Sequence, residues 1–490
     1  MRKILRSGLS AALLLGLLLS GISCTQTSSV TPTPSAPLPS EPIPTPALTA
    51  TPVPSVSPSL APTTGVTLQE GNNFLETALQ PKDSREIEDN RIGTSLGSYE
   101  PGYANTQVVY PIGFKWIHIS FSTDPLNWQY VETKLGEYTI DPACDRAITE
   151  YAGNGTKIVL NLGVGSWENR LDVTRFKSQE DVDRYCGFAR FMVGHFKDRI
   201  EYYEIWNEPG DIDVQDYANL IKHVVPVIRE EYPGAKIVIG ATHGDWATGY
   251  PGYGDSGRFT LAIDYLKTLL RSGVAPIVDG ISWHPFYGNR PDDPYYRNYP
   301  QMVQQIKELA TSEGFRGDYF ADEIVWRTAG DNLDPQIQRV SEIVAAKYFL
   351  RSIVMHRGLA TNITIGLPGA HDPTLQKVQA IHNLCDLMAG AEPTDLPVEI
   401  QGEIENIRTY SFSLPNGDKL VALWTDDVAV DNDPGIEATV TLPDFSAEKV
   451  TGIDVLHGFE QELATSIEDG SLVIHNLLIK DYPVIIRLSD

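Results

Sequence analysis

At residues 202–209 the chain reads Tyr-Tyr-Glu-Ile-Trp-Asn-Glu-Pro, an aromatic and β-branched run that ends in an acid followed by proline. The apolar part predicts a short buried strand. The proline predicts its end, because proline has no N–H to donate to a sheet. Asn207 and Glu208 are therefore expected at the carboxyl end of the strand. Active sites of parallel-stranded barrels lie at this end, so Glu208 is a candidate catalytic acid.

Strand-like segments alternate with helical ones on both sides of this run. Eight strands are expected, beginning at Arg91, Phe114, Lys157, Ile200, Lys236, Val278, Tyr319 and Ile363, and most are separated by segments of helical periodicity. The pattern predicts a (β/α)8 TIM barrel, an α/β fold whose usual length of about 250 residues is close to this span. A doubly wound open sheet is the alternative, but no Gly-rich phosphate loop follows the first strand.

After Met388 the pattern changes to strands without helices. The turn at residues 415–418, Pro-Asn-Gly-Asp, predicts a hairpin because Asn-Gly readily adopts the positive φ of a tight turn. We therefore expect a catalytic barrel over residues 65–390 and a small antiparallel β-sandwich over residues 391–490. Bracing of the barrel is favoured over ligand binding as the role of the sandwich.

The N-terminal stretch has the layout of an export signal. Arg2, Lys3 and Arg6 precede an apolar run at residues 11–19 that is too short to span a bilayer. Small residues then lead to Cys24, as at a bacterial lipoprotein processing site, and plain signal cleavage is the alternative. Residues 1–24 are thus expected to be a signal peptide. Residues 25–64, rich in Pro, Thr and Ser, are expected to be a disordered linker.

Composition limits the partners of the protein. The chain has 490 residues and a formal net charge of -26, which disfavours nucleic acid and anionic lipid and suits a neutral substrate. Membrane contact is expected only through a lipid anchor at Cys24. The remaining cysteines, Cys144, Cys186 and Cys385, are an odd number, so they form no disulfide framework, although a Cys144–Cys186 bridge and buried free thiols both stay open. No spacing indicates a metal site, and no cofactor is implied.

A second carboxylate, Glu323, follows the seventh expected strand. It should project at the same rim as Glu208, three strands away. Two carboxylates across a pocket can cleave a glycosidic bond, since one protonates the departing oxygen and the other stabilises or attacks the anomeric carbon. Asp322 competes for the second role. Strand alternation favours Glu323, which would share an inward face with Tyr319 and Ala321.

Three motifs in this order resemble the clan A glycoside hydrolases, retaining (β/α)8 enzymes that include families 5, 39 and 51. The motifs are Trp-Asn-Glu-Pro at 206–209, Ser-Trp-His-Pro-Phe-Tyr at 282–287, and Asp322-Glu323 with Trp326. The barrel followed by a sandwich is most similar to family 39. The resemblance implies that Glu208 is the general acid/base and Glu323 the nucleophile.

The resemblance also implies roles around this pair. Asn207 would hydrogen-bond the sugar 2-hydroxyl, Tyr287 would hydrogen-bond the nucleophile, and His284 would line the same subsite. The chain departs from many relatives in three ways: the tyrosine stands one residue later, the arginine of strand two is replaced in the run Lys115 to His118, and the tryptophan of strand eight is missing.

Aromatic residues near strand ends are candidates to stack on sugar rings. These are Trp167, Trp246, Trp283 and Trp326, of which Trp326 is favoured as a platform, and His243 and Asp245 are further candidate contacts. The sequence thus predicts an exported, envelope-tethered or extracellular retaining glycosidase that acts on poly- or oligosaccharides. A non-catalytic carbohydrate-binding lipoprotein on the same barrel is the alternative, and a purely structural envelope protein is a third interpretation.

Overall fold

The computed structural model describes residues 74, 76–97, 109–121, 123–163, 176–242, 262–330, 337–370 and 372–489. All of them belong to the compact unit Leu68–Asp490. The expected signal peptide with Cys24, the linker, and the candidates Trp167, His243, Asp245 and Trp246 lie outside the described residues. Within the described ranges, no helix combines the length and apolar character needed to cross a bilayer.

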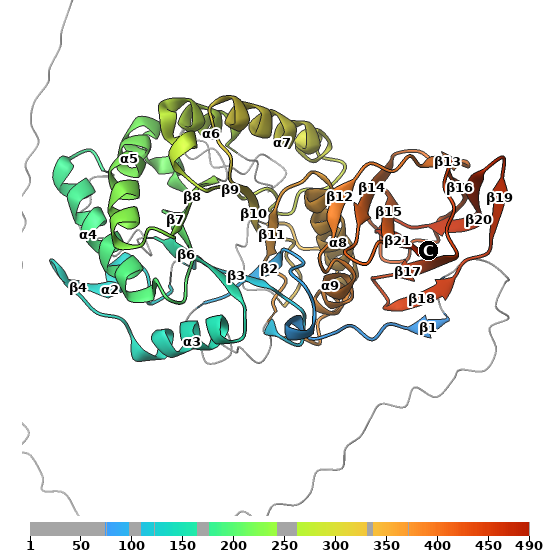
Figure 1. Cartoon of the computed structure of the whole chain (residues 1–490), viewed down its shortest axis with the longest axis horizontal. Coiled ribbons are helices and arrows are strands. Elements are labelled where there is room, and N and C mark those ends of the chain that lie inside the picture. Colours follow the sequence, from blue (N-terminus) through green and yellow to red (C-terminus); the bar gives the residue numbers. More distant parts are fainter. Residues whose placement is uncertain are drawn as a thin grey trace, which may run out of the picture. The chain divides into compact units, whose positions relative to one another are not determined.

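Eight parallel strands of the described chain close into a barrel, in the order β10-β11-β2-β3-β6-β7-β8-β9 (Figure 1). Their bounds are β2 Ile92–Ser95, β3 Trp116–Ile119, β6 Lys157–Leu162, β7 Tyr202–Ile205, β8 Lys236–Thr242, β9 Gly280–Trp283, β10 Asp318–Ile324 and β11 Ile363–Gly366. The predicted (β/α)8 barrel is therefore confirmed, and the closed strand order rules out the open sheet.

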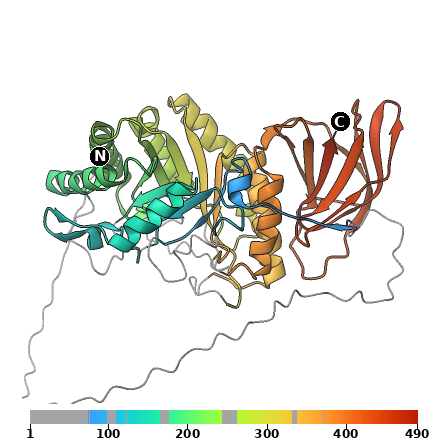
Figure 2. The same ribbon diagram turned by 60° about the horizontal axis from the view of Figure 1, so that its bottom comes forward.

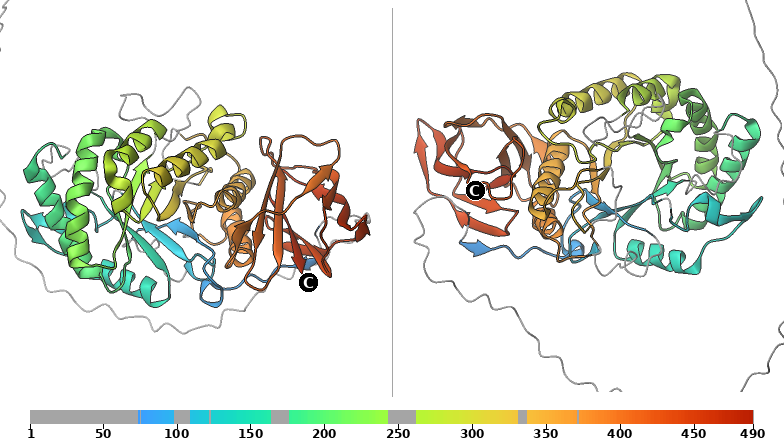
Figure 3. Two further views of the ribbon diagram at one scale, coloured as in Figure 1. Left: turned by 45° about the horizontal axis from the view of Figure 1, so that its top comes forward. Right: turned by 180° about the vertical axis from the view of Figure 1, so that it is seen from behind.

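Helices surround the barrel strands (Figure 3). They include α3 Pro142–Gly153, α4 Gln179–Phe196, α5 Val214–Glu231, α6 Ile263–Leu269, α7 Pro294–Ser312, α8 Glu342–Gly358 and α9 Gln376–Leu387. Helix α4 is capped by Ser178, whose side chain accepts a hydrogen bond from the Asp181 N–H. Helix α7 begins where Asp293 caps it and Pro294 occupies the first turn, in which no N–H is needed.

The C-terminal strands form the two sheets of a sandwich (Figure 2). One sheet has the order β1-β18-β17-β21-β15-β14-β12 and the other β13-β16-β20-β19. The bounds are β1 Thr77–Ala78, β12 Glu392–Thr394, β13 Glu399–Gln401, β14 Ile407–Ser413, β15 Lys419–Thr425, β16 Ile436–Leu442, β17 Lys449–Asp454, β18 Phe459–Glu462, β19 Thr465–Glu468, β20 Ser471–Ile479 and β21 Val484–Ser489. The predicted sandwich is confirmed.

Two local features of the sandwich bear on the sequence predictions. The hairpin between β14 and β15 turns through Gly417, whose φ is 100°, and the Leu414 N–H donates to the Asp418 carbonyl at 2.9 Å. Strand β1, which precedes the barrel, pairs with β18. Residues near 77 therefore belong to the sandwich, although the boundary at residue 65 assigned them to the barrel.

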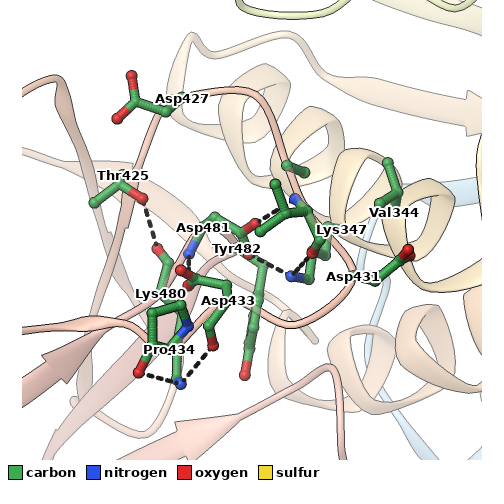
Figure 4. A network of polar contacts seen from close by, with 12 residues as sticks. Val344, Lys347, Thr425, Asp427, Asp431, Asp433, Pro434, Lys480, Asp481 and Tyr482 are labelled. Carbon is green, nitrogen blue, oxygen red and sulfur yellow. Dashed lines mark hydrogen bonds and ion pairs between the residues drawn. The ribbon is translucent and has the colours of Figure 1, made fainter.

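Helix α8 joins the barrel to the sandwich through buried cations (Figure 4). Lys347 Nζ lies 2.6 Å from Asp481 Oδ1, and the two side chains are 2% and 5% exposed. One turn later, Arg351 donates to the carbonyls of Asp427 at 2.7 Å and Thr425 at 3.1 Å. These contacts support a bracing role for the sandwich.

The thiols of Cys186 and Cys385 are free. The bridge between Cys144 and Cys186 is therefore not made. Burial raises the pKa of the Cys186 thiol to about 11, so it is not an activated nucleophile at neutral pH.

Removing one partner of the Lys347–Asp481 pair is expected to be costly. Lys347→Met leaves the Asp481 carboxylate buried without its cation, so the free energy of unfolding should fall by about 3–5 kcal/mol in a denaturant titration. Lys134→Ala removes an exposed pair with Glu137, whose side chains are 75% and 64% exposed, and serves as the matched control. Its loss should stay below about 1 kcal/mol. Equal losses in the two variants would contradict a bracing role for this contact.

Candidate active site

The turn after β7 holds Glu208 at the carboxyl end of the barrel. Trp206 and Glu208 both adopt left-handed backbone, with φ of 66° and 46°, and Pro209 begins a short turn at Pro209–Asp211. A left-handed conformation at a residue other than glycine costs about 1–3 kcal/mol and is typical of functional sites. The side chain of Glu208 lies beyond the end of the strand, where its Oε1 is 3.0 Å from His284 Nδ1.

The face of β10 that was predicted to point inward is wrong. Tyr319 and Ala321 lie in the core between strands and helices, whereas Phe320 packs in the barrel interior. Alternation therefore directs Asp322 inward, where it is fully buried, and would direct Glu323 toward the helices.

Irregular backbone is what brings Glu323 into the site. Its φ is 53°, and the register between β10 and β11 shifts between Ala321 and Ile324. A bulge of this kind redirects one side chain at the rim of a barrel. The carboxylate thus shares a site with Glu208, as the sequence predicted, but through a bulge that residue alternation does not reveal.

Glu208 and Glu323 face each other beside one imidazole. His284 Nδ1 lies 3.0 Å from Glu208 Oε1 and 3.4 Å from Glu323 Oε2. One oxygen of each carboxylate and one nitrogen of His284 all lie within 4.8 Å of one another. Retaining glycosidases hold their two carboxyl groups about 5–5.5 Å apart and inverting ones about 6.5–9.5 Å apart, so this close approach of two carboxylate oxygens agrees with the retaining arrangement.

Neutral donors complete the contacts of Glu323. The Tyr287 hydroxyl donates to Oε2 at 2.8 Å, and the Ser120 hydroxyl donates to Oε1 at 2.5 Å. Tyr287 reaches the carboxylate although it stands one residue later than in many relatives, because its backbone bridges to Val325 while Phe286 turns into the core. Ser120 follows β3 on the same face as His118, so residue alternation along the sequence could have identified it.

A second missed group is a buried polar cluster beneath the pair. Glu204 Oε2 lies 2.8 Å from His118 Nε2 and accepts from Asn161 Nδ2 at 2.8 Å. The Ser282 hydroxyl donates to Glu204 Oε1 at 2.5 Å. Glu204 is an acid inside an apolar strand, and this contrast could have identified it from the sequence as a buried polar residue.

The charges of the site shift its pKa values. Burial disfavours the imidazolium of His284, but Glu323, Glu208 and Asp322 outweigh burial and raise its pKa to about 10. Burial and the neighbouring charge of Glu204 raise the pKa of Asp322 to about 8. Burial would raise the pKa of Glu204, yet His118 and the hydrogen bonds from Ser282 and Asn161 hold it below its usual value.

The candidate sugar-binding residues Trp326 and Asn207 differ in burial. Trp326 is 1% exposed, stacks on Tyr348 and donates from Nε1 to the Asn289 carbonyl at 2.9 Å. It belongs to the core, so the expected stacking platform is wrong. Asn207 is half-buried at the rim, and its buried Oδ1 has no hydrogen-bond partner among the described residues.

Two trios of side chains bring carboxylate oxygens and imidazole nitrogens within 4.8 Å, the distance range of a shared ligand. They are His118, Glu204 and Asp322, and Glu208, His284 and Glu323. In the first trio both oxygens of Glu204 already accept hydrogen bonds. In the second, Glu323 is engaged by two hydroxyl groups. We therefore interpret Glu204 and Glu323 as members of hydrogen-bonded networks rather than as metal ligands.

Comparison with known proteins gives a fold-level relationship. No family model and no curated protein matches the sequence. Among solved structures, a family 39 glycoside hydrolase from Bacteroides cellulosilyticus WH2 is similar with a TM-score of 0.60 and 18% identity, over 84% of this chain and 83% of that chain.

Two further structures extend the same relationship. CelM2, a bifunctional glucanase-xylanase from a metagenome library, has a TM-score of 0.54 at 12% identity, over 85% of this chain and 99% of that chain. The family 30 xylanase C from Talaromyces cellulolyticus has a TM-score of 0.51 at 12% identity, over 86% and 99%. The chain therefore shares its fold with clan A glycoside hydrolases, as the sequence resemblance implied.

Proposed function

We propose that the protein is a glycoside hydrolase that cleaves poly- or oligosaccharides with retention of configuration. Glu208 serves as general acid/base and Glu323 as nucleophile. The observation that carries the proposal is the approach of the two carboxylates within 4.8 Å at the carboxyl end of the barrel. The shared fold with glycoside hydrolases supports the same reaction class.

The proposed reaction is a double displacement. Glu323 attacks the anomeric carbon and forms a glycosyl ester, while Glu208 gives its proton to the departing glycosidic oxygen. Glu208, now a carboxylate, then takes a proton from water. The water oxygen attacks the anomeric carbon and releases Glu323 as a carboxylate. The hydroxyl groups of Ser120 and Tyr287 orient Glu323 for both steps.

Substrate contacts at the reacting sugar are assigned to the residues around this pair. The half-buried Asn207 supplies a side-chain amide beside Glu208, which suits a hydrogen bond to the sugar 2-hydroxyl. The net charge of -26 suits a neutral saccharide better than an anionic one.

Nucleophile replacement tests this assignment. On an activated aryl glycoside that the protein hydrolyses in a panel screen, Glu323→Ala should lose nearly all turnover. Azide should restore it and give a glycosyl azide of inverted configuration, because azide occupies the space of the missing carboxylate. Glu208→Ala should instead give azide rescue with retained configuration.

The result that would move the nucleophile is rescue of Asp322→Ala with inversion while Glu323→Ala stays inactive. Sugar binding with no turnover of any panel substrate would favour the non-catalytic carbohydrate-binding protein. Neither binding nor turnover would favour a structural role.

The donors to Glu323 should also matter for rate. Tyr287→Phe and Ser120→Ala each remove one hydrogen bond to a charged group, so kcat/KM should fall by about ten-fold to a hundred-fold. Tyr319→Phe is the matched control, since this tyrosine lies on the same strand as Glu323 but packs against Phe315 on the helix side. It should keep kcat/KM within about two-fold. Equal effects of Tyr287→Phe and Tyr319→Phe would contradict the assigned contact.

We also propose that the protein is exported and anchored through lipid on Cys24. The support is the basic and apolar order of residues 1–24 ahead of a Pro/Thr/Ser-rich linker. Metabolic labelling with a radioactive fatty acid should mark the wild-type chain and not Cys24→Ser. Labelling of neither chain, with both found in the medium, would indicate plain signal cleavage.

A further inference from the structure

Asp322 is a buried carboxyl group that has no part in the proposed bond-making steps. It directly precedes Glu323 on β10, it is 0% exposed, and neither of its oxygens makes a hydrogen bond within the described ranges. A buried carboxyl without hydrogen bonds is costly, so its presence calls for a physical reason.

The imidazole of His284 lies between Asp322 and the two catalytic carboxylates. His284 Nε2 is 3.6 Å from Asp322 Oδ1. The opposite nitrogen, Nδ1, is 3.0 Å from Glu208 and 3.4 Å from Glu323. The 3.6 Å separation is longer than a hydrogen bond, but contacts of this kind often tighten only when substrate is bound.

We propose that Asp322 is a positioning residue that acts through His284. Its carboxyl group holds the proton on Nε2, so Nδ1 presents its own proton to Glu208 and Glu323. The effect of Asp322 on catalysis rests on the proposed function. The protonation state of the His284 ring does not.

A doubly protonated ring would act as one counter-ion for both catalytic groups. Before glycosylation, Glu323 carries the negative charge and Glu208 carries a proton. Afterwards Glu323 is an ester and Glu208 is the carboxylate. His284 contacts both groups, so the charge moves between two neighbours of the same imidazolium. The ring keeps its proton throughout, and no solvent reorganisation is needed to follow the charge.

The groups that face this unit come from four parts of the barrel. They are His118 on β3, Glu204 and Glu208 on and after β7, Tyr287 after β9, and Glu323 on β10. Burial and Glu204 raise the pKa of Asp322 to about 8. Below that pH a neutral carboxyl still offers an oxygen to Nε2–H. Above it, the ionised carboxylate attracts the imidazolium more strongly, in line with the pKa of about 10 for His284.

Proton linkage predicts that Asp322→Asn folds. The carboxyl keeps its proton to about pH 8 in the folded protein, whereas in the unfolded chain it ionises near pH 3.8. Between pH 3.8 and about pH 8 unfolding releases a proton from Asp322, so the free energy of unfolding falls as the pH rises. An asparagine has the same shape and does not ionise. The variant should therefore be at least as stable as wild type at pH 8.

The test is the titration of His284 in the full-length protein labelled with ¹³C and ¹⁵N histidine. Its ring signals are assigned by their loss in His284→Asn. In wild type, both ring nitrogens should be protonated at pH 7, and the proton should be lost well above the ordinary histidine range. In Asp322→Asn the midpoint should fall by about one pH unit or more. Asp318→Asn is the matched control. Asp318 lies on the same strand, in a separate pocket with Asn362 and Glu392, so its replacement should leave the midpoint of His284 unchanged.

Either of two results would overturn the inference. One is a neutral His284 ring at pH 7 in wild type, which needs no variant to be measured. The other is an equal midpoint in Asp322→Asn and wild type. Because no substrate is used, a protein without glycosidase activity can still confirm or contradict the proposed state of the ring.

Discussion

The carboxylate of Glu204 ties four barrel strands together directly beneath the candidate active site. From β7 it reaches His118 on β3, Asn161 on β6 and Ser282 on β9, with contacts of 2.5–2.8 Å. Asn161 also donates to the carbonyl of Trp206 at 2.7 Å, and Trp206 opens the turn that carries Glu208. Both oxygens of Glu204 are engaged in this buried network, which fixes the direction of the side chains around them. The geometry of the site depends on it.

Above this network, the chain places both catalytic candidates by departing from regular strand geometry. Glu208 and Glu323 each have positive φ, at 46° and 53°. Strain of about 1–3 kcal/mol per residue can persist only where the surroundings fix the conformation. For Glu323 the surroundings are Ser120, Tyr287 and His284. The two carboxylates are thereby brought close enough for direct attack on a sugar and proton transfer to its leaving group.

Sequence reasoning succeeded where a local pattern decides the structure. Apolar runs placed the eight barrel strands. Pro209 indicated that β7 ends nearby, although the strand already stops at Ile205, before the left-handed Trp206. It failed where the outcome depends on contacts distant in the sequence. The bulge at Glu323 is seen as a register shift between β10 and β11, so alternation from Tyr319 and Ala321 could not reveal how Glu323 reaches the site. The core position of Trp326 depends on packing against Tyr348 of α8. Ser120 could have been found, because it continues the inward alternation of β3.

The stereochemistry of the first product tests the central claim most directly. Proton NMR of the reducing sugar released from an aryl glycoside, recorded before mutarotation, reports its anomeric configuration. The short distance between Glu208 and Glu323 predicts that the first-formed sugar has the configuration of the substrate. A first product of opposite configuration would contradict the account, because a single displacement by water requires two carboxylates that stand farther apart.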